Sequence, residues 1–281
     1  MNTSPCANSE GPDRAARHLD NRRAFDSVAQ DYDGPLGNNS LVQHMRSALW
    51  RSIVDCVPTG GRLLDLGCGT GLDAEHLARQ GYRVVAVDWS PAMIERAKSR
   101  VAGAGLVGRI SVRAVGIHHL DQLRDEKFDC LYSNLGALNC LPDLPALAES
   151  CDELLVPRGK LVISVIGRHC PWEILYYLAR GNLKRARIRY ARGMVPVPLN
   201  QRTVWTAYYA PREFYAAFAD MAELTSYRGL NLFLPPPYLV HWCRRWPRLC
   251  ATLAWIDDRF GALPVLRNAG DHFLMILTKR A

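Results

Sequence analysis

The segment from Arg62 to Ala78, RLLDLGCGTGLDAEHLA, constrains the fold of this chain more than any other part of it. It opens with an apolar run, Leu63 to Leu66, that glycines bound on both sides, as is typical of a central strand in a parallel sheet. The glycines at positions 67, 69 and 71 allow a sharp turn at positive φ and let the backbone lie against a ligand. The following residues, Leu72 to Arg79, predict a helix whose N-terminus carries partial positive charge. Together they predict the first unit of an α/β fold.

A second strand is predicted directly after this helix, from Arg83 to Val87, and it ends at Asp88. An acid at the tip of the second strand, about 20 residues past the glycines, can accept hydrogen bonds from both hydroxyls of a ribose. Asp88 lies 21 positions after Gly67. We therefore expect Asp88 to bind a nucleoside, and Met93, early in the next helix, to cover its base.

The motifs DLGCGTG and VVAVDWSPAMIERAK resemble the first two motifs of the class I S-adenosylmethionine-dependent methyltransferases. The turn GCGTG, with Asp65 two residues before its first glycine, differs from the GxGxxG fingerprint of dinucleotide-binding proteins. The resemblance implies a Rossmann-like, doubly wound α/β fold, with a seven-stranded sheet whose last strand is antiparallel and with helical cap elaborations. It also implies S-adenosyl-L-methionine as cofactor, S-adenosyl-L-homocysteine as product, and no metal ion.

The same resemblance implies which residues contact the cofactor. They are Tyr32, Asp65, Gly67, Cys68, Gly69, Asp88, Trp89, Met93, Gly116, Ile117, Asn134 and Leu135. Tyr32 belongs to a "YD" segment that folds over the bound cofactor in many small-molecule members, although simple packing would also explain it.

The third strand, around residues 109–115, is followed by a departure from the family pattern. Gly116 stands where the family usually has an acid that accepts a hydrogen bond from the adenine amino group. The backbone amide of Ile117 and the side chain of His118 are the groups that we expect to contact adenine instead.

The fourth strand, residues 128–132, leads into the segment that should border the reacting methyl group. The carboxyl ends of parallel strands line the ligand crevice of such sheets, which places Asn134 and Leu135 there. Asn139 is predicted to cap a helix, with a contact to substrate as the alternative.

The region after the predicted fifth strand, residues 157–167, elaborates on the basic fold. Residues 171–192 predict one helix, with an apolar stripe on one face and basic residues on the other. This helix either roofs the substrate pocket or docks with a solvated basic face. Residues 194–211 predict a hairpin, and further strands are expected at 224–230 and 272–277. The substrate-binding candidates are Tyr32, Arg168, His169, Trp172, Tyr176 and Tyr208.

The chain is long enough for one large α/β domain with insertions. We expect a disordered tail over residues 1–20 and a helical lid over 21–57. The cofactor-binding core is expected over 58–167, substrate-side insertions including strand six over 168–270, and the final strand over 271–281.

The net charge of +8 is distributed unevenly. Residues 1–167 hold 18 basic and 20 acidic side chains, whereas residues 168–281 hold 17 basic and 7 acidic ones. This asymmetry indicates either a surface for an anionic partner or a solvated basic face. We keep three interpretations of the aromatic segment at 233–266: a lipophilic pocket, a peripheral membrane contact or a subunit contact.

The nine scattered cysteines, an odd number, predict reduced core residues and no disulfide framework or zinc site. The N-terminal residues have no hydrophobic core of a secretory signal, and no apolar run approaches the roughly 20 residues of a membrane span. These features predict a cytoplasmic protein without a transmembrane segment.

Methyl transfer from a sulfonium depends mainly on positioning, and a base is needed only if the acceptor carries a proton of high pKa. The catalytic candidates are His118, His169 and Asn134, with His119 as a further possible base. We expect a methyltransferase for a small lipophilic or anionic metabolite, of the ubiquinone/menaquinone-biosynthesis type. An RNA- or protein-directed methyltransferase, with salt-dependent binding to polyanions, and a non-catalytic nucleoside-binding protein are the alternatives. The substrate, the methylated atom and the oligomeric state are left open.

Overall fold

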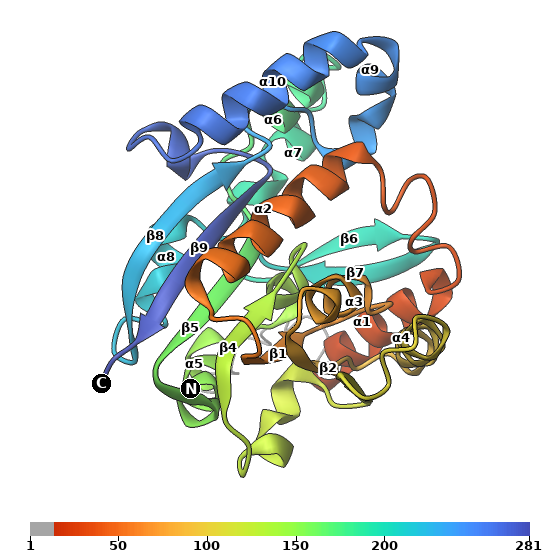
Figure 1. The fold of residues 1–281 in the computed structure, drawn as a ribbon. Coiled ribbons are helices and arrows are strands. Elements are labelled where there is room, and N and C mark those ends of the chain that lie inside the picture. The colour runs from red at the N-terminus through yellow and green to blue at the C-terminus, as the bar shows by residue number, and fades with distance from the viewer. Residues whose placement is uncertain (1–13) are drawn as a thin grey trace, which may run out of the picture.

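The computed structural model describes residues 14–281, and within them a seven-stranded sheet forms the centre of the molecule (Figure 1). The strand order is β3-β2-β1-β4-β5-β9-β8. The strands are β1 (Arg62–Leu66), β2 (Arg83–Val87), β3 (Ile110–Arg113), β4 (Phe128–Ser133), β5 (Leu155–Ile166), β8 (Ala222–Leu230) and β9 (His272–Lys279). Strands β1 to β5 pair in parallel, whereas β9 is antiparallel to both β5 and β8. The predicted α/β fold with an antiparallel last strand is confirmed.

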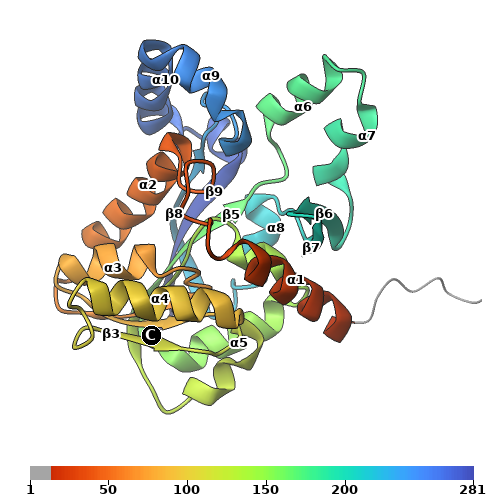
Figure 2. The ribbon, with the colours of Figure 1, turned by 90° about the vertical axis from the view of Figure 1, so that its right-hand side faces the viewer.

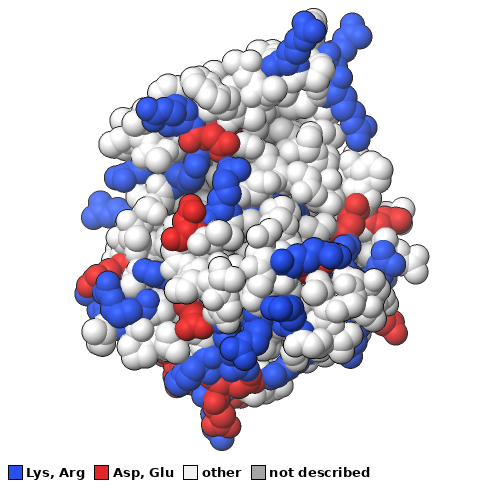
Figure 3. Space-filling model, in the orientation of Figure 1, with Lys and Arg blue, Asp and Glu red and all other residues white. Residues whose placement is uncertain are grey.

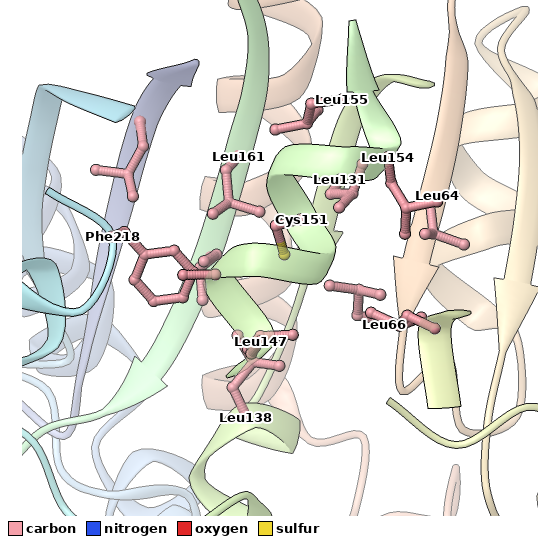
Figure 4. Close-up of a cluster of buried hydrophobic side chains, with 14 of the residues drawn as sticks. Leu64, Leu66, Leu131, Leu138, Leu147, Cys151, Leu154, Leu155, Leu161 and Phe218 are labelled. Atoms are coloured by element: carbon pink, nitrogen blue, oxygen red, sulfur yellow. The ribbon is translucent and has the colours of Figure 1, made fainter. Parts of the chain in front are cut away.

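Helices cover both faces of the sheet because successive residues of its strands point to opposite sides. On one face, Leu63 and Val84 pack with α2 (Ser40–Cys56), α3 (Leu72–Arg79) and α4 (Pro91–Gly103). On the other face, Leu64 and Val85 pack with η1 (Ile117–Leu123), α5 (Leu144–Leu154) and α8 (Pro211–Ala216). Figure 4 shows α5 laying Leu147, Cys151 and Leu154 against this second face. The inner strands β1, β2 and β4 are therefore buried on both sides, whereas the edge strand β8 is largely exposed.

The N-terminal helix α1 (Arg14–Val28) lies between α4 and the hairpin of β6 (Val195–Leu199) and β7 (Arg202–Thr206) (Figure 2). Asn21 Nδ2 donates to the Trp205 carbonyl at 3.1 Å, and the Trp205 amide donates back to Asn21 Oδ1 at 2.6 Å. Trp205 Nε1 donates to Asp20 Oδ2 at 3.0 Å. The prediction of disorder is therefore wrong for residues 14–20, because contacts with a distant hairpin hold this polar helix; the rest of that predicted tail lies outside the described residues.

The single helix predicted over residues 171–192 is also wrong. The structure has α6 (Pro171–Leu178), α7 (Leu183–Ala186) and η3 (Ile188–Tyr190) in its place. The break comes at Gly181, whose φ of +68° is left-handed, and at Asn182, whose side chain accepts a hydrogen bond from the Arg185 amide at 3.0 Å and so caps α7.

Two more helices, α9 (Val240–Arg245) and α10 (Pro247–Phe260), precede β9, with η4 (Pro237–Leu239) before them and η5 (Leu266–Asn268) after them. Cys243 and Cys250 form a disulfide, because the chain bends between the two helices and brings their Cα atoms within 5.4 Å. The expectation that all cysteines are reduced is wrong for this pair. Of the other cysteines in the described part, six are free, and Cys6 lies outside it. In residues 14–281 no helix has the length and apolar character needed to cross a bilayer.

Candidate functional site

A cavity lies at the carboxyl ends of β1 to β4, where ligands bind in parallel α/β sheets. Ten of the residues predicted to contact cofactor or substrate, or to act in catalysis, line it. They are Tyr32, Gly67, Gly69, Asp88, Trp89, Met93, Ile117, His118, Asn134 and Leu135. Asp65, Cys68 and Gly116 lie in the adjoining chain segments without lining the cavity themselves.

The glycine turn and Asp88 form the middle of the cavity. The amides of Gly67 and Cys68 both donate to the Val87 carbonyl, at 3.0 and 2.9 Å, which holds the turn against the end of β2. Gly67 has φ +79°, and a Cβ there would lie 2.6 Å from the Ala137 Cβ, so only glycine fits.

The carboxylate of Asp88 is fixed by backbone amides on both sides. Gly69 N donates to its Oδ2 at 2.9 Å, and Ser90 N donates to its Oδ1 at 2.8 Å. Burial raises the pKa of Asp88. Each oxygen keeps capacity to accept another hydrogen bond. The arrangement suits a ligand with two adjacent hydroxyls, such as a ribose.

Two further acids, Asp65 and Asp73, lie beside the turn. Burial, followed by the neighbouring Asp73, raises the pKa of Asp65 well above its usual value, and the Tyr132 hydroxyl lies next to its carboxyl group. Asp73 accepts from Arg46 Nη1 at 2.5 Å and from Asn134 Nδ2 at 3.2 Å. The Asp73 side chain thus orients the Asn134 side chain, which lines the cavity.

Aromatic rings fill the end of the cavity next to β3. A Cβ placed on Gly116 would lie 2.6 Å from His118 Cε1 and 2.9 Å from Trp89 Cε3. The His118 ring therefore occupies the space into which a side chain at position 116 would project. It also stacks on His18 of α1, with 4.4 Å between ring centroids.

The His118 ring is neutral at pH 7. Burial, and then the positive charges of His18, His119 and Arg14, lower the pKa of His118 to about 4. A neutral imidazole offers one donor and one acceptor nitrogen. His118 can therefore exchange hydrogen bonds with the edge of a base, and it stands where the family pattern would place an acid.

The end of the cavity next to β4 is mainly apolar. It is lined by Leu135, Ala137, Cys140 and Leu141, which all follow β4 in the chain. Asn139 does not face the cavity or cap a helix, which corrects the prediction. Its Nδ2 donates to the Ile166 and Ala207 carbonyls, at 3.1 and 2.6 Å, and its Oδ1 accepts from the Ile166 amide at 2.9 Å. Asn139 thus ties β5 to the chain after β7.

The residues after 167 that we predicted to bind substrate lie outside the cavity. Arg168 pairs with Glu213 at 2.8 Å, and His169 Nδ1 lies 3.1 Å from the Tyr190 hydroxyl. Trp172 Nε1 donates to the Phe233 carbonyl at 2.8 Å. The Tyr176 ring packs under Arg180, and the Tyr208 ring lies 5.3 Å from the Arg189 guanidinium. Two of the three catalytic candidates, His118 and Asn134, line the cavity, and His169 does not.

Helix α1 supplies residues of the cavity that sequence reasoning missed: His18, Asn21, Arg22 and Phe25. The only signal in the sequence was that Phe25 and Tyr32 fall on one helical face. The polar first turns of α1 carry no apolar periodicity, so nothing predicted their contact with the site.

Comparison with known proteins adds to this geometry. A family model described as a methyltransferase domain matches residues 64–163. A "Ubiquinone biosynthesis O-methyltransferase" of Xylella fastidiosa is 36% identical over 110 residues, which cover 39% of this chain and 44% of the relative. A protein of the same name from Xanthomonas oryzae pv. oryzae is 34% identical over 150 residues, 53% of this chain and 61% of the relative. The chain thus matches about half the length of these relatives.

A solved structure resembles nearly the whole chain. It is the 1,6-didemethyltoxoflavin-N1-methyltransferase of Burkholderia thailandensis, with its substrate and S-adenosylhomocysteine bound. It covers 98% of this chain and 94% of its own, with a TM-score of 0.60 and 16% identity. At 16% sequence identity, this structural similarity establishes the fold alone.

Proposed function

Because the chain belongs to the class I S-adenosylmethionine-dependent methyltransferases, we propose that it transfers a methyl group from S-adenosylmethionine to a small molecule. One observation carries this proposal. The Asp88 carboxylate is held by the amides of Gly69 and Ser90 on the wall of a cavity that the glycine turn also lines.

The residues of the cavity fit the parts of this cofactor in the order of the strands. Asp88 after β2 would accept hydrogen bonds from the ribose, and Trp89, Met93 and His118 would surround the adenine on the side of β3. The bound cofactor supplies a methyl group on a positively charged sulfur, so the leaving group is already activated, and the protein has chiefly to position the acceptor.

We propose that the acceptor binds at the β4 end and is a flat, largely apolar molecule with a phenolic hydroxyl. The apolar side chains of Leu135 and Leu141 support the first feature. The hydroxyl is our inference from the similarity to ubiquinone biosynthesis O-methyltransferases, which methylate oxygen.

The side chains at the β4 end offer little for removing the acceptor's proton. Burial raises the pKa of Cys140 to about 12, so its thiol stays protonated at neutral pH. His118 lies at the β3 end, where it stacks on His18. We therefore expect methyl transfer to become faster with rising pH until the acceptor's own hydroxyl is ionised.

The test is a methyl-transfer assay with S-adenosylmethionine and a panel of catechols that carry alkyl chains of increasing length. We expect methylated product and S-adenosylhomocysteine in equal amounts, with KM falling as the chain lengthens. Asp88→Ala should abolish turnover at ordinary cofactor concentrations, and Arg96→Ala, on the exposed face of α4, should not. Methylation of RNA or protein but of no catechol would contradict the proposed substrate class.

A further inference from the structure

One end of the molecule carries most of its exposed large hydrophobic side chains. In the described part of the chain 17 such side chains are exposed, and 12 of them lie within residues 171–190 and 237–265. They are Leu175, Leu178, Leu183, Tyr190, Tyr238, Trp242, Trp246, Leu249, Trp255, Phe260, Leu263 and Val265. Figures 1 and 2 show that these segments, which contain α6, α7, α9 and α10, project at the same end. We call residues 171–190 and 237–265 the apical surface.

The two segments form one surface because aromatic rings join them. The rings of Trp172 and Trp242 are 6.2 Å apart, and those of Tyr176 and Tyr238 are 6.3 Å apart. The Tyr238 hydroxyl also donates to Glu173 at 3.1 Å. The exposed apolar side chains of the two segments therefore belong to one continuous surface.

The charge of this surface is strongly positive. Its exposed basic residues are Arg180, Lys184, Arg185, Arg187, Arg244, Arg245, Arg248 and Arg259. Of the acids in the same two segments, Glu173 is buried against Arg189, and Asp257 is buried under three backbone amides. Asp258 is the exposed one. In Figure 3, Lys and Arg project from this end over α9 and α10.

We propose that the apical surface docks on an anionic lipid bilayer. Tryptophan, tyrosine and leucine side chains enter the boundary between headgroups and acyl chains, and neighbouring arginines pair with lipid phosphates. Basic groups already lie over the rings, with Arg180 3.6 Å from the Tyr176 centroid and Arg245 5.9 Å from that of Trp246. An almost complete lack of exposed acids complements an anionic membrane better than a mixed-charge protein surface.

The apical surface also contacts residues 29–39, the loop between α1 and α2. Asn39 Nδ2 donates to the Pro237 carbonyl at 3.1 Å, and Arg244 donates to the Pro35 carbonyl at 3.3 Å. The same loop region carries Tyr32, which lines the cavity. Docking would thus bring the edge of the cavity close to the bilayer, where a lipophilic acceptor would be dissolved.

The proposal is tested by flotation of the full chain with vesicles. Vesicles of equal parts phosphatidylcholine and phosphatidylglycerol should carry the protein upward, and vesicles of phosphatidylcholine alone should carry much less of it. Tryptophan emission should shift to the blue on binding, and added salt should weaken it. The pair Arg245→Glu and Arg248→Glu should lower the partition coefficient at least about tenfold, and so should Trp246→Ser with Trp255→Ser.

The matched control is the pair Arg96→Glu and Lys98→Glu, which makes the same charge change on the exposed face of α4. It should retain most of the binding, and all variants should keep the wild-type melting temperature. The proposal is overturned if the wild type does not float with anionic vesicles, or if the α4 pair loses as much binding as the apical pair. Self-association that buries the tryptophans, seen by analytical ultracentrifugation and removed by Trp246→Ser with Trp255→Ser, would also overturn it.

Discussion

The side chains allowed at positions 116 and 118 depend on each other, because the His118 ring occupies the space into which a side chain at position 116 would project. The backbone of Gly116, with φ −73°, would accept any residue, so only the contact with His118 and Trp89 forbids a side chain. An acidic side chain at position 116 and an imidazole at position 118 would thus occupy the same space at the β3 end of the cavity.

We predict that Gly116→Asp weakens binding of S-adenosylhomocysteine by about fivefold to a hundredfold, because overpacking this end of the cavity costs about 1–3 kcal/mol. His118→Ala should weaken it less. The double variant should bind more tightly than Gly116→Asp alone, because the carboxylate then has room. Isothermal titration calorimetry measures all three, and equal affinities of Gly116→Asp with and without His118 would contradict the coupling.

His118 also makes stability depend on pH. Its pKa of about 4 in the folded protein lies below the value of about 6.5 in an unfolded chain, so unfolding takes up a proton between these values. The contribution of His118 should therefore be intact above about pH 6.5 and decline as pH falls toward 4. Thermal melts from pH 4 to 7 should show a shallower decline for His118→Phe than for the wild type; identical slopes would contradict this account.

The residues at the centre of the site were predictable because their roles follow from local spacing. Gly67, Gly69 and Asp88 belong to one β–turn–α–β unit, whose geometry is fixed within 30 residues. The fit between Gly116 and His118 was not predictable, since it depends on how Trp89 and His18 pack from other elements.

At the scale of elements, α1 is held to the cavity by a hairpin about 180 residues away in the sequence. We predict that Trp205→Ala releases α1, because it removes the bond to Asp20 and the packing of Arg17 on the ring. S-adenosylhomocysteine should bind more weakly, and trypsin should cleave within α1 sooner. Trp255→Ala, on the exposed side of α10, is the control and should change neither. Unchanged binding and unchanged proteolysis in Trp205→Ala would contradict the role of Trp205 in holding α1.

A buried arginine anchors the elements between β5 and β6. Arg189 bonds to Glu173 at 2.8 Å, to Asp271 Oδ1 at 2.6 Å and to the Gly167 carbonyl at 2.9 Å. We predict that Arg189→Met lowers the free energy of unfolding by about 3–5 kcal/mol, because two buried carboxylates lose their partner. Urea unfolding measures this, with the exposed Arg185→Met as control; a loss below about 1 kcal/mol would contradict the assigned role.

This anchor should also weaken in acid. Although burial opposes the shift, Arg189 and His272 hold the pKa of Asp271 well below its usual range. Its stabilising contribution is therefore present above about pH 4 and is lost as pH falls below that value.

Most elements of the sheet could be predicted, because buried parallel strands are short apolar runs. Helices α6 and α7 could not be separated, since their apolar stripe continues across Gly181, and only the left-handed φ there ends the first helix. The disulfide was missed because it depends on the bend between α9 and α10.

At the scale of the whole molecule, the excess of positive charge in residues 168–281 and the exposed aromatic side chains meet at the apical surface, whereas the cavity lies at the carboxyl ends of β1 to β4. The charge asymmetry is visible in the sequence. That the basic and aromatic side chains share one surface is not, because α6 and α9 are about 70 residues apart and only the fold brings them together. The cavity, and not the fold, indicates the function, since the same fold would also suit a binding protein that catalyses no reaction.

The most direct measurement is calorimetric titration of the full chain with S-adenosylhomocysteine, for the wild type, Asp88→Ala and the exposed control Asp121→Ala. The wild type and the control should bind one equivalent with equal affinity. Asp88→Ala should bind at least about a hundredfold more weakly, because two hydrogen bonds to a charged group are lost. An absence of binding by the wild type, or equal affinity of Asp88→Ala, would contradict the account.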